Sequence, residues 1–209
     1  MTPPMHNYKR YRARMPFNHR KMIEATQAIL ADYPRPKELT AYFALPESFR
    51  ETDKALRKEI EERTGIKLIY PFDYDPNGGM RPDAVPFDEE KVLSSHMLIR
   101  HIPNASIGAT HETATATYFQ KPVLVYASGE RFFSYPWVLE YASNVDSSKE
   151  LWIRKIHAAK IMYDKLDKDE KSWNPKFRDF INHYRTRIDG GEGDAPHLEK
   201  LIDHFLLKK

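Results

Sequence analysis

The chain of 209 residues contains no cysteine, which excludes disulfides, thiolate nucleophiles and cysteine-ligated zinc. It also lacks any apolar run approaching the roughly 20 residues that a membrane-spanning helix needs. The first 14 residues have no apolar central region, so we expect no signal peptide and a soluble, cytoplasmic protein without membrane contact. No Walker motif, Gly-x-Gly-x-x-Gly motif or serine elbow is present, and no cofactor is predicted.

Acidic residues are missing from the first 21 positions, although the whole chain has a net charge of only +3. The basic residues there are Lys9, Arg10, Arg12, Arg14, Arg20 and Lys21. We interpret residues 1–36 as a basic arm followed by an N-terminal helix. The composition favours a solubilising surface tail over an arm that contacts nucleic acid or a partner protein.

Short apolar segments alternate with amphipathic segments through the middle of the chain. Strands are predicted over residues 39–45, 66–70, 97–102 and 123–126, and helices over residues 48–64, 88–94 and 108–119. This alternation is typical of β-α-β units, which form parallel sheets with helices on both faces. For residues 37–146 we therefore predict a doubly wound, mainly parallel α/β core of the flavodoxin- or Rossmann-like kind.

The last third of the chain is predicted to be helical. Helices are expected to begin near Ser148, Asn174 and Pro196, so residues 147–209 form a helical extension packed on the core. The aromatic residues of this extension fit either packing within one chain or an interface with a second copy. Residues 71–86 are dense in Pro, Gly, Asn and Asp and are predicted to form a long loop, a candidate lid.

The stretch from His101 to Glu112 leaves the sheet where doubly wound folds bind ligands, at the carboxyl ends of the strands. Gly108 is expected to permit a tight turn and close approach of a ligand, and Ser106 offers a hydroxyl beside the unpaired N–H groups of a helix start. With a helix beginning near Ala109, Glu112 falls in the first turn, where the helix dipole favours its ionised form. An ionised carboxylate can attack the anomeric carbon of a sugar. The alternative is that a glutamate in a first turn simply stabilises the helix.

Other polar side chains near this edge are candidates for substrate binding. Arg100 and His101 follow the third strand and suit a phosphate group, although a salt bridge or an internally bonded histidine explains them as well. Glu47, after the first strand, is placed to reach a ribose. His96 and His111 are expected near the same crevice, but no carboxylate is spaced with the histidines as in a metal motif, so no metal is predicted.

Four features occur in an order that resembles one known family. They are the turn Tyr42-Phe43-Ala44-Leu45-Pro46, the apolar third strand, the motif Ser106-x-Gly108-x-x-x-Glu112-x-x-x-Ala116, and the Gln-Lys-Pro-Val-Leu-Val segment that follows. Over roughly residues 39–127, the chain is similar to the nucleoside 2-deoxyribosyltransferase-like superfamily, which includes nucleotide N-glycoside hydrolases.

The resemblance implies roles for individual residues. Glu112 would be the nucleophile, Tyr42 would orient it, and Ser106 with Gly108 would hold the sugar hydroxyl or the 5′-phosphate. Ala44 and Pro46 belong to the turn at the same crevice. The chain departs from the family in three places. Ser94-Ser95-His96 stands where an Asp commonly precedes the third strand, Thr113-Ala114 stands where a Gly often follows the nucleophile, and Leu45 stands where many members have a Gly in the first-strand turn.

The sequence thus predicts an enzyme that cleaves or transfers the N-glycosidic bond of a nucleoside or nucleotide. The acceptor is water or a second base, and the sugar is ribose or deoxyribose with or without a 5′-phosphate. Two alternatives stay open. One is a non-catalytic module that senses a nucleotide or nucleotide sugar, and the other is a NAD-cleaving relative.

Overall fold

The protein is described from a computed structural model, which places residues 24, 28–33, 37–45, 50–70, 73, 84–103, 106–128, 144–146 and 148–166. The strands are β1 (Thr40–Ala44), β2 (Lys67–Ile69), β3 (Met97–Ile102), β4 (Val123–Ala127) and β5 (Asn144–Asp146). The helices are α3 (Arg50–Thr64), α4 (Ala84–Ser94), α5 (Ile107–Tyr118) and α7 (Lys149–Asp164). Among the helices so described, none is long and apolar enough to cross a membrane.

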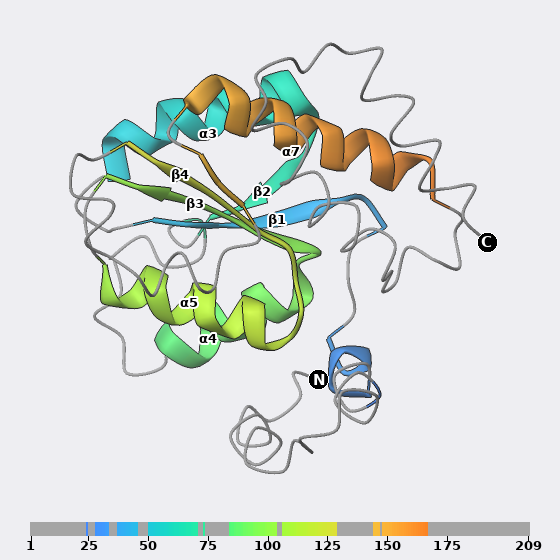
Figure 1. Cartoon of the computed structure of the whole chain (residues 1–209). Helices are drawn as coiled ribbons and strands as arrows, with labels where there is room; N and C mark the ends of the chain where they lie inside the picture. Colours follow the sequence, from blue (N-terminus) through green and yellow to red (C-terminus); the bar gives the residue numbers. More distant parts are fainter. Residues whose placement is uncertain are drawn as a thin grey trace.

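The strands form one parallel sheet in the order β2-β1-β3-β4-β5. Figure 1 shows α3 and α7 covering one face and α4 and α5 covering the other. This is a flavodoxin-like arrangement, and it confirms the predicted doubly wound α/β fold. The strand order reverses between β1 and β3, so the carboxyl ends of these two strands mark the place where such folds bind ligands.

The sequence prediction missed one strand and misplaced one helix start. β5 has only three residues, Asn144–Asp146, which is too short to show a period-two pattern. α4 begins at Ala84, inside the segment predicted as a loop over 71–86, and Pro86 stands in its first turn, where a helix tolerates proline. Within that segment the structure also describes Asp73, whose carboxylate accepts a hydrogen bond from Arg57 of α3 at 2.6 Å.

Side chains of each strand alternate between the two faces of the sheet, and each face has its own apolar cluster. The cluster under α3 and α7 includes Leu39, Ala41, Phe43, Leu68, Ile99, Leu124, Ile60, Trp152 and Ile156. The cluster under α4 and α5 includes Tyr42, Ala44, Leu98, Val123, Val125, Val92, Ala109 and Ala116. Because both faces are covered, β1 and β3 are buried at every position, which explains their nearly continuous apolar sequences.

The predicted N-terminal helix is present where the structure describes it, since residue 24 and residues 28–31 are helical. Ile29, Leu30 and Tyr33 pack with Leu93 of α4 and with Phe119, which follows α5. The described part of the predicted N-terminal helix therefore packs on the core. The basic residues 9–21 lie outside the described residues, as do the helices predicted near Asn174 and Pro196.

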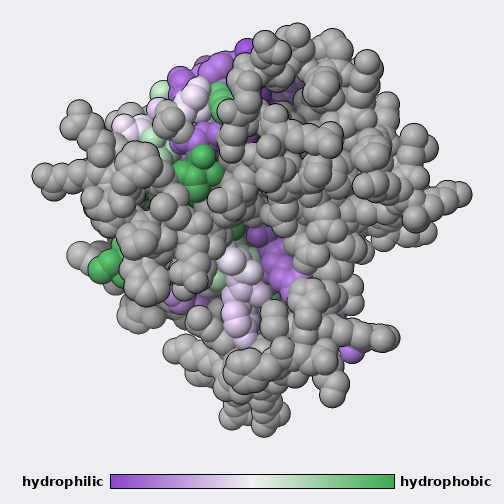
Figure 2. Space-filling view, in the orientation of Figure 1, coloured by the Kyte–Doolittle hydropathy of each residue, from purple (hydrophilic) through white to green (hydrophobic). Residues whose placement is uncertain are grey.

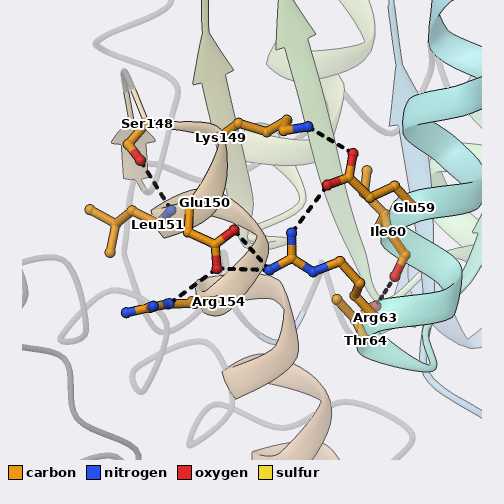
Figure 3. Close-up of polar contacts among 9 residues, drawn as sticks. All are labelled: Glu59, Ile60, Arg63, Thr64, Ser148, Lys149, Glu150, Leu151 and Arg154. Atoms are coloured by element: carbon orange, nitrogen blue, oxygen red, sulfur yellow. Dashed lines mark hydrogen bonds and ion pairs between the residues drawn. The ribbon is translucent and has the colours of Figure 1, made fainter.

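α3 and α7 lie side by side, and ion pairs join their exposed sides (Figure 3). Arg63 donates to both carboxylate oxygens of Glu150 at 2.7 and 2.8 Å, and Lys149 donates to Glu59 at 2.8 Å. Figure 2 shows mainly hydrophilic colours along the upper edge, where α3 and α7 lie in Figure 1. Exposed pairs of this kind contribute at most about 1 kcal/mol each, so they orient the two helices more than they stabilise them.

Another ion pair joins α7 to β5 and is buried. Lys155 Nζ lies 2.6 Å from Asp146 Oδ1, and their side chains are 0% and 2% exposed. Burying two charges is costly, but removing one partner costs more, because the other charge then stays in the interior without its counterion. The short β5 strand is thereby fixed to the helix that follows it.

We predict that Lys155→Met lowers the free energy of unfolding by about 3–5 kcal/mol, because it removes the ammonium group that lies 2.6 Å from the buried carboxylate of Asp146. The matched control is Lys149→Met, which removes an exposed pair and should cost no more than about 1 kcal/mol. Urea unfolding of both variants measures the difference. Equal losses in the two variants would contradict the role assigned to the buried pair.

Candidate active site

Ser106 sets the position of Glu112 by capping helix α5. Its side-chain oxygen accepts a hydrogen bond from the backbone N–H of Ala109 at 3.3 Å, and the helix begins at Ile107. Glu112 therefore lies in the second turn, not in the first turn that the sequence analysis expected. The capping role occupies the Ser106 oxygen as an acceptor, and its hydroxyl hydrogen remains available to a ligand.

Tyr42 and Glu112 form the central contact of the site. The Tyr42 hydroxyl donates to Glu112 Oε1 at 2.8 Å. Tyr42 points towards α5 because alternate residues of β1 face that helix, and its side chain is fully buried, while Glu112 is 7% exposed. The contact implied by the family resemblance is thus present in the structure. Glu112 Oε2 is buried and has no hydrogen-bond partner among the described residues.

Arg100 lies beneath the same helix and is held by two threonines. Its Nη1 donates to Thr113 Oγ1 and its Nη2 to Thr110 Oγ1, both at 3.0 Å. The two threonine hydroxyls donate in turn to backbone carbonyls of α5, at 2.6 and 2.7 Å. This explains threonines in a helix for which they have poor propensity, since each hydroxyl connects the buried guanidinium to the helix backbone. Arg100 is 1% exposed, and its two Nη atoms are bonded to side chains of α5.

The environment of Glu112 raises the pKa of its carboxyl from the ordinary 4.5 to about 7. Burial is the largest cause, and the negative charge of Asp88 on α4 adds to it. The hydrogen bond from Tyr42 and the positive charges of Arg100 and His111 act in the opposite direction but are weaker. The expectation that the helix dipole keeps Glu112 in its ionised form is therefore wrong, because the cost of burying the charge exceeds the help from its neighbours.

Arg100 stays cationic at neutral pH although burial lowers its pKa to about 10. His111, on α5, places Nε2 2.7 Å from Glu89 Oε1, so it belongs to a pair between α5 and α4. A carboxyl group with a pKa near 7 can exchange a proton at neutral pH, and its ionised fraction is more basic than an ordinary carboxylate. The site therefore offers either a general acid–base group or a nucleophile.

His101 does not join this site. Arg100 and His101 are neighbours on β3, so their side chains point to opposite faces of the sheet. His101 lies on the face of α3 and α7, with Nδ1 3.0 Å from Asp53 Oδ1 and Nε2 2.8 Å from Ser128 Oγ. The sequence analysis missed Asp53 and Ser128, which stand 48 and 27 residues from His101 and share no motif with it.

His96 lies at the opposite end of the strands, just before β3 begins. Its Nδ1 accepts from the backbone N–H of Thr40 at 3.1 Å, and its Nε2 is 3.0 Å from the Tyr163 hydroxyl. The expectation that His96 borders the crevice is wrong. In a parallel sheet all strands begin at the same end, which is opposite the end where their carboxyl termini and the crevice lie. His96 instead joins β1 to α7.

The remaining predicted residues have simpler positions. Ala44 is fully buried at the end of β1. Gly108 stands in the first turn of α5 without a positive φ, so it is not needed for a tight turn. Apart from its chain neighbours and the backbone of its own helix, none of the described residues has an atom within 4 Å of where its Cβ would be. Pro46 and Glu47 lie outside the described residues. Among the residues that the structure places, no cluster of three or more His, Asp or Glu side chains is arranged to hold a metal ion.

The raised pKa of Glu112 predicts a stability that depends on pH. Between pH 4 and 8 the folded protein holds this proton longer than the unfolded chain does, so Glu112 destabilises the fold as pH rises, by roughly 3 kcal/mol in full above pH 7. Glu112→Gln cannot lose a proton, and its stability relative to the wild type should rise by that amount from pH 4 to pH 8. Tyr42→Phe removes a hydrogen bond to the carboxylate and should enlarge the loss. Unfolding free energies measured at both pH values test this, and a constant difference between Glu112→Gln and wild type would contradict it.

Comparison with known proteins found no family model that matches the chain and no curated protein that matches it, so the family resemblance rests on the motifs between Tyr42 and Val125.

Proposed function

We propose that the protein cleaves or transfers the N-glycosidic bond of a nucleoside or nucleotide, with Glu112 as the reacting carboxylate. The observation that carries the proposal is the hydrogen bond from Tyr42 to Glu112 at 2.8 Å, close to the point where the strand order of the sheet reverses. It brings together two residues, 70 positions apart, that the family motifs single out. The flavodoxin-like sheet supports the same reading, since this edge is where doubly wound folds bind nucleotides.

The two oxygens of Glu112 have different surroundings, and this suggests their roles. Oε1 accepts the hydrogen bond from Tyr42, which fixes the plane of the carboxylate, while Oε2 has no partner among the described residues. In the proposed reaction Oε2 forms a bond to the anomeric carbon, the bond from this carbon to the base nitrogen breaks, and the base leaves with the electron pair and takes up a proton. Water or a second base then attacks the anomeric carbon, loses a proton and releases Glu112.

The electrostatics suit a nucleophile that works near neutral pH. Glu112 has to be ionised to attack, and with a pKa of about 7 roughly half of the molecules are ionised at that pH. The buried cation of Arg100 lowers the cost of the charge without a hydrogen bond to the carboxylate, because its Nη atoms are held by Thr110 and Thr113. The carboxylate thus keeps its basicity and a free oxygen.

We predict that Glu112→Gln lowers the rate of base release by at least about a hundredfold, equivalent to 2.7 kcal/mol in the barrier, because the amide keeps the shape but not the nucleophilic charge. The measurement is chromatography of bases released from a panel of nucleosides, deoxynucleotides and NAD. Glu62→Gln, on the exposed side of α3, is the matched control and should keep the wild-type rate. Absence of base release by the wild type across the whole panel would refute the proposal.

The rate of base release should also rise with pH. Because only ionised Glu112 attacks, kcat should fall about tenfold per pH unit below 7 and level off above it. Tyr42→Phe removes a hydrogen bond that lowers the pKa, so its profile should be displaced to higher pH. A wild-type profile that is flat between pH 5 and 8 would contradict the assignment of Glu112 as the nucleophile.

The burial of Glu112 also favours a second candidate, a binding module without turnover. Glu112 is only 7% exposed, and its carboxyl is protonated in about half of the molecules at neutral pH, a state in which it does not attack a sugar. In that case a nucleotide or nucleotide sugar would bind without loss of its base. Binding measured by calorimetry that Glu112→Ala leaves unchanged, with no product from the wild type, would favour this candidate.

A further inference from the structure

On the face of the sheet opposite Glu112, three side chains form a chain of hydrogen bonds that ends at an exposed serine. Asp53 comes from the first turn of α3, His101 from β3, and Ser128 directly follows β4. Asp53 Oδ1 lies 3.0 Å from His101 Nδ1, and His101 Nε2 lies 2.8 Å from Ser128 Oγ. Asp53 is fully buried, the His101 side chain is 9% exposed, and Ser128 is exposed. Only the last member of the chain is accessible to a reactant.

We assign the directions of these hydrogen bonds from the chemistry of the groups. With Asp53 as a carboxylate, which only accepts, His101 Nδ1 is the donor and Asp53 Oδ1 the acceptor. In the neutral imidazole Nε2 is then the acceptor, and the hydroxyl of Ser128 donates to it. Asp53 Oδ2 has no partner among the described residues, which leaves His101 as the group that compensates this buried carboxylate.

Neighbouring rings hold His101 in this orientation. Its imidazole is stacked on Tyr126 with ring centroids 5.0 Å apart and planes 10° apart, and Tyr126 stacks in turn on Trp152 at 5.5 Å. The imidazole therefore keeps both hydrogen bonds at once. A serine, an imidazole and a buried carboxylate at hydrogen-bond distance in this order are the groups that make a serine hydroxyl nucleophilic.

We propose that Ser128 is a nucleophile activated by His101 and that it accepts acyl groups from activated esters or thioesters. Asp53 is the positioning residue, which fixes the tautomer of His101. This assignment is independent of the reaction proposed for Glu112, because the two sets of residues lie on opposite faces of the sheet.

The steps are those of acyl transfer. Ser128 Oγ forms a bond to the carbonyl carbon while its proton moves to His101 Nε2. The bond from that carbon to the leaving oxygen or sulfur then breaks, and the leaving group takes the proton from Nε2. Water, losing a proton to His101, afterwards hydrolyses the acyl-serine ester to a carboxylic acid and restores Ser128.

The backbone around Ser128 limits which substrates react. Its N–H group donates to the carbonyl oxygen of Ile102 at 3.3 Å, so this N–H does not stabilise a negative charge on the substrate carbonyl. We therefore expect reaction with aryl esters and thioesters, whose leaving groups carry negative charge well, and not with amides.

The test is covalent labelling of the whole wild-type protein with an alkyl fluorophosphonate, followed by mass spectrometry of the peptides. In this reaction the serine oxygen bonds to phosphorus and fluoride leaves. The internal control is Ser148, another exposed serine, whose oxygen caps α7 and which has no imidazole beside it. Ser128 should be labelled at least about a hundredfold faster than Ser148, the contribution expected of a general base. Equal labelling of the two serines would overturn the proposal.

Two further measurements assign the roles of the other residues. His101→Gln should reduce labelling of Ser128 to the rate of Ser148, and p-nitrophenyl acetate should acetylate Ser128 in the wild type but not in this variant. Labelling of His101→Gln at the wild-type rate would refute the role of the imidazole. For Asp53 the readout is the ¹⁵N NMR spectrum of His101, in which the wild type should show a protonated Nδ1 and Asp53→Asn should lose this preference. A wild-type imidazole protonated at Nε2 would overturn the assignment.

Discussion

The alternation of side chains along β3 is the constraint on which both proposed sites depend. Arg100 and His101 are adjacent in sequence, and because a strand directs successive side chains to opposite faces, each enters a separate layer of helices. Arg100 joins Glu112 and Tyr42 under α5, while His101 joins Asp53 and Ser128 under α3 and α7. One strand thus supplies a cation to one proposed reactive group and the proposed base to the other.

Burial shapes both proposed sites, but in different ways. For Glu112 the loss of solvation outweighs its favourable neighbours and moves the pKa of the carboxyl to about 7. For His101 the decisive feature is geometry, since a buried carboxylate and two stacked rings fix which nitrogen faces the serine. Both effects can be described from the residues of this chain alone, without a metal or a cofactor.

The sequence predicted the fold well because the fold depends on local patterns. The apolar runs gave β1, β3 and β4 to within a residue or two, and the pairing of Tyr42 with Glu112 followed from the resemblance. The pKa of Glu112 could not be predicted, because it depends on the depth of burial under the sheet and on Asp88 of another helix. The contacts of His101 with Asp53 and Ser128 were equally hidden, since they join three elements whose relative placement only the folded structure shows.

The threonines of α5 have one further consequence, which concerns the rotation of the helix about its axis. Thr110 and Thr113 both face Arg100, and their hydroxyls are bonded at each end, to the guanidinium and to the helix carbonyls. A shift of the helix by one residue would turn it by about 100° and break both contacts. The two threonines therefore fix the rotation of α5 about its axis. This rotation of the helix places Glu112 beside Tyr42. The Tyr42 hydroxyl then bonds to Oε1, and Oε2 has no hydrogen-bond partner among the described residues.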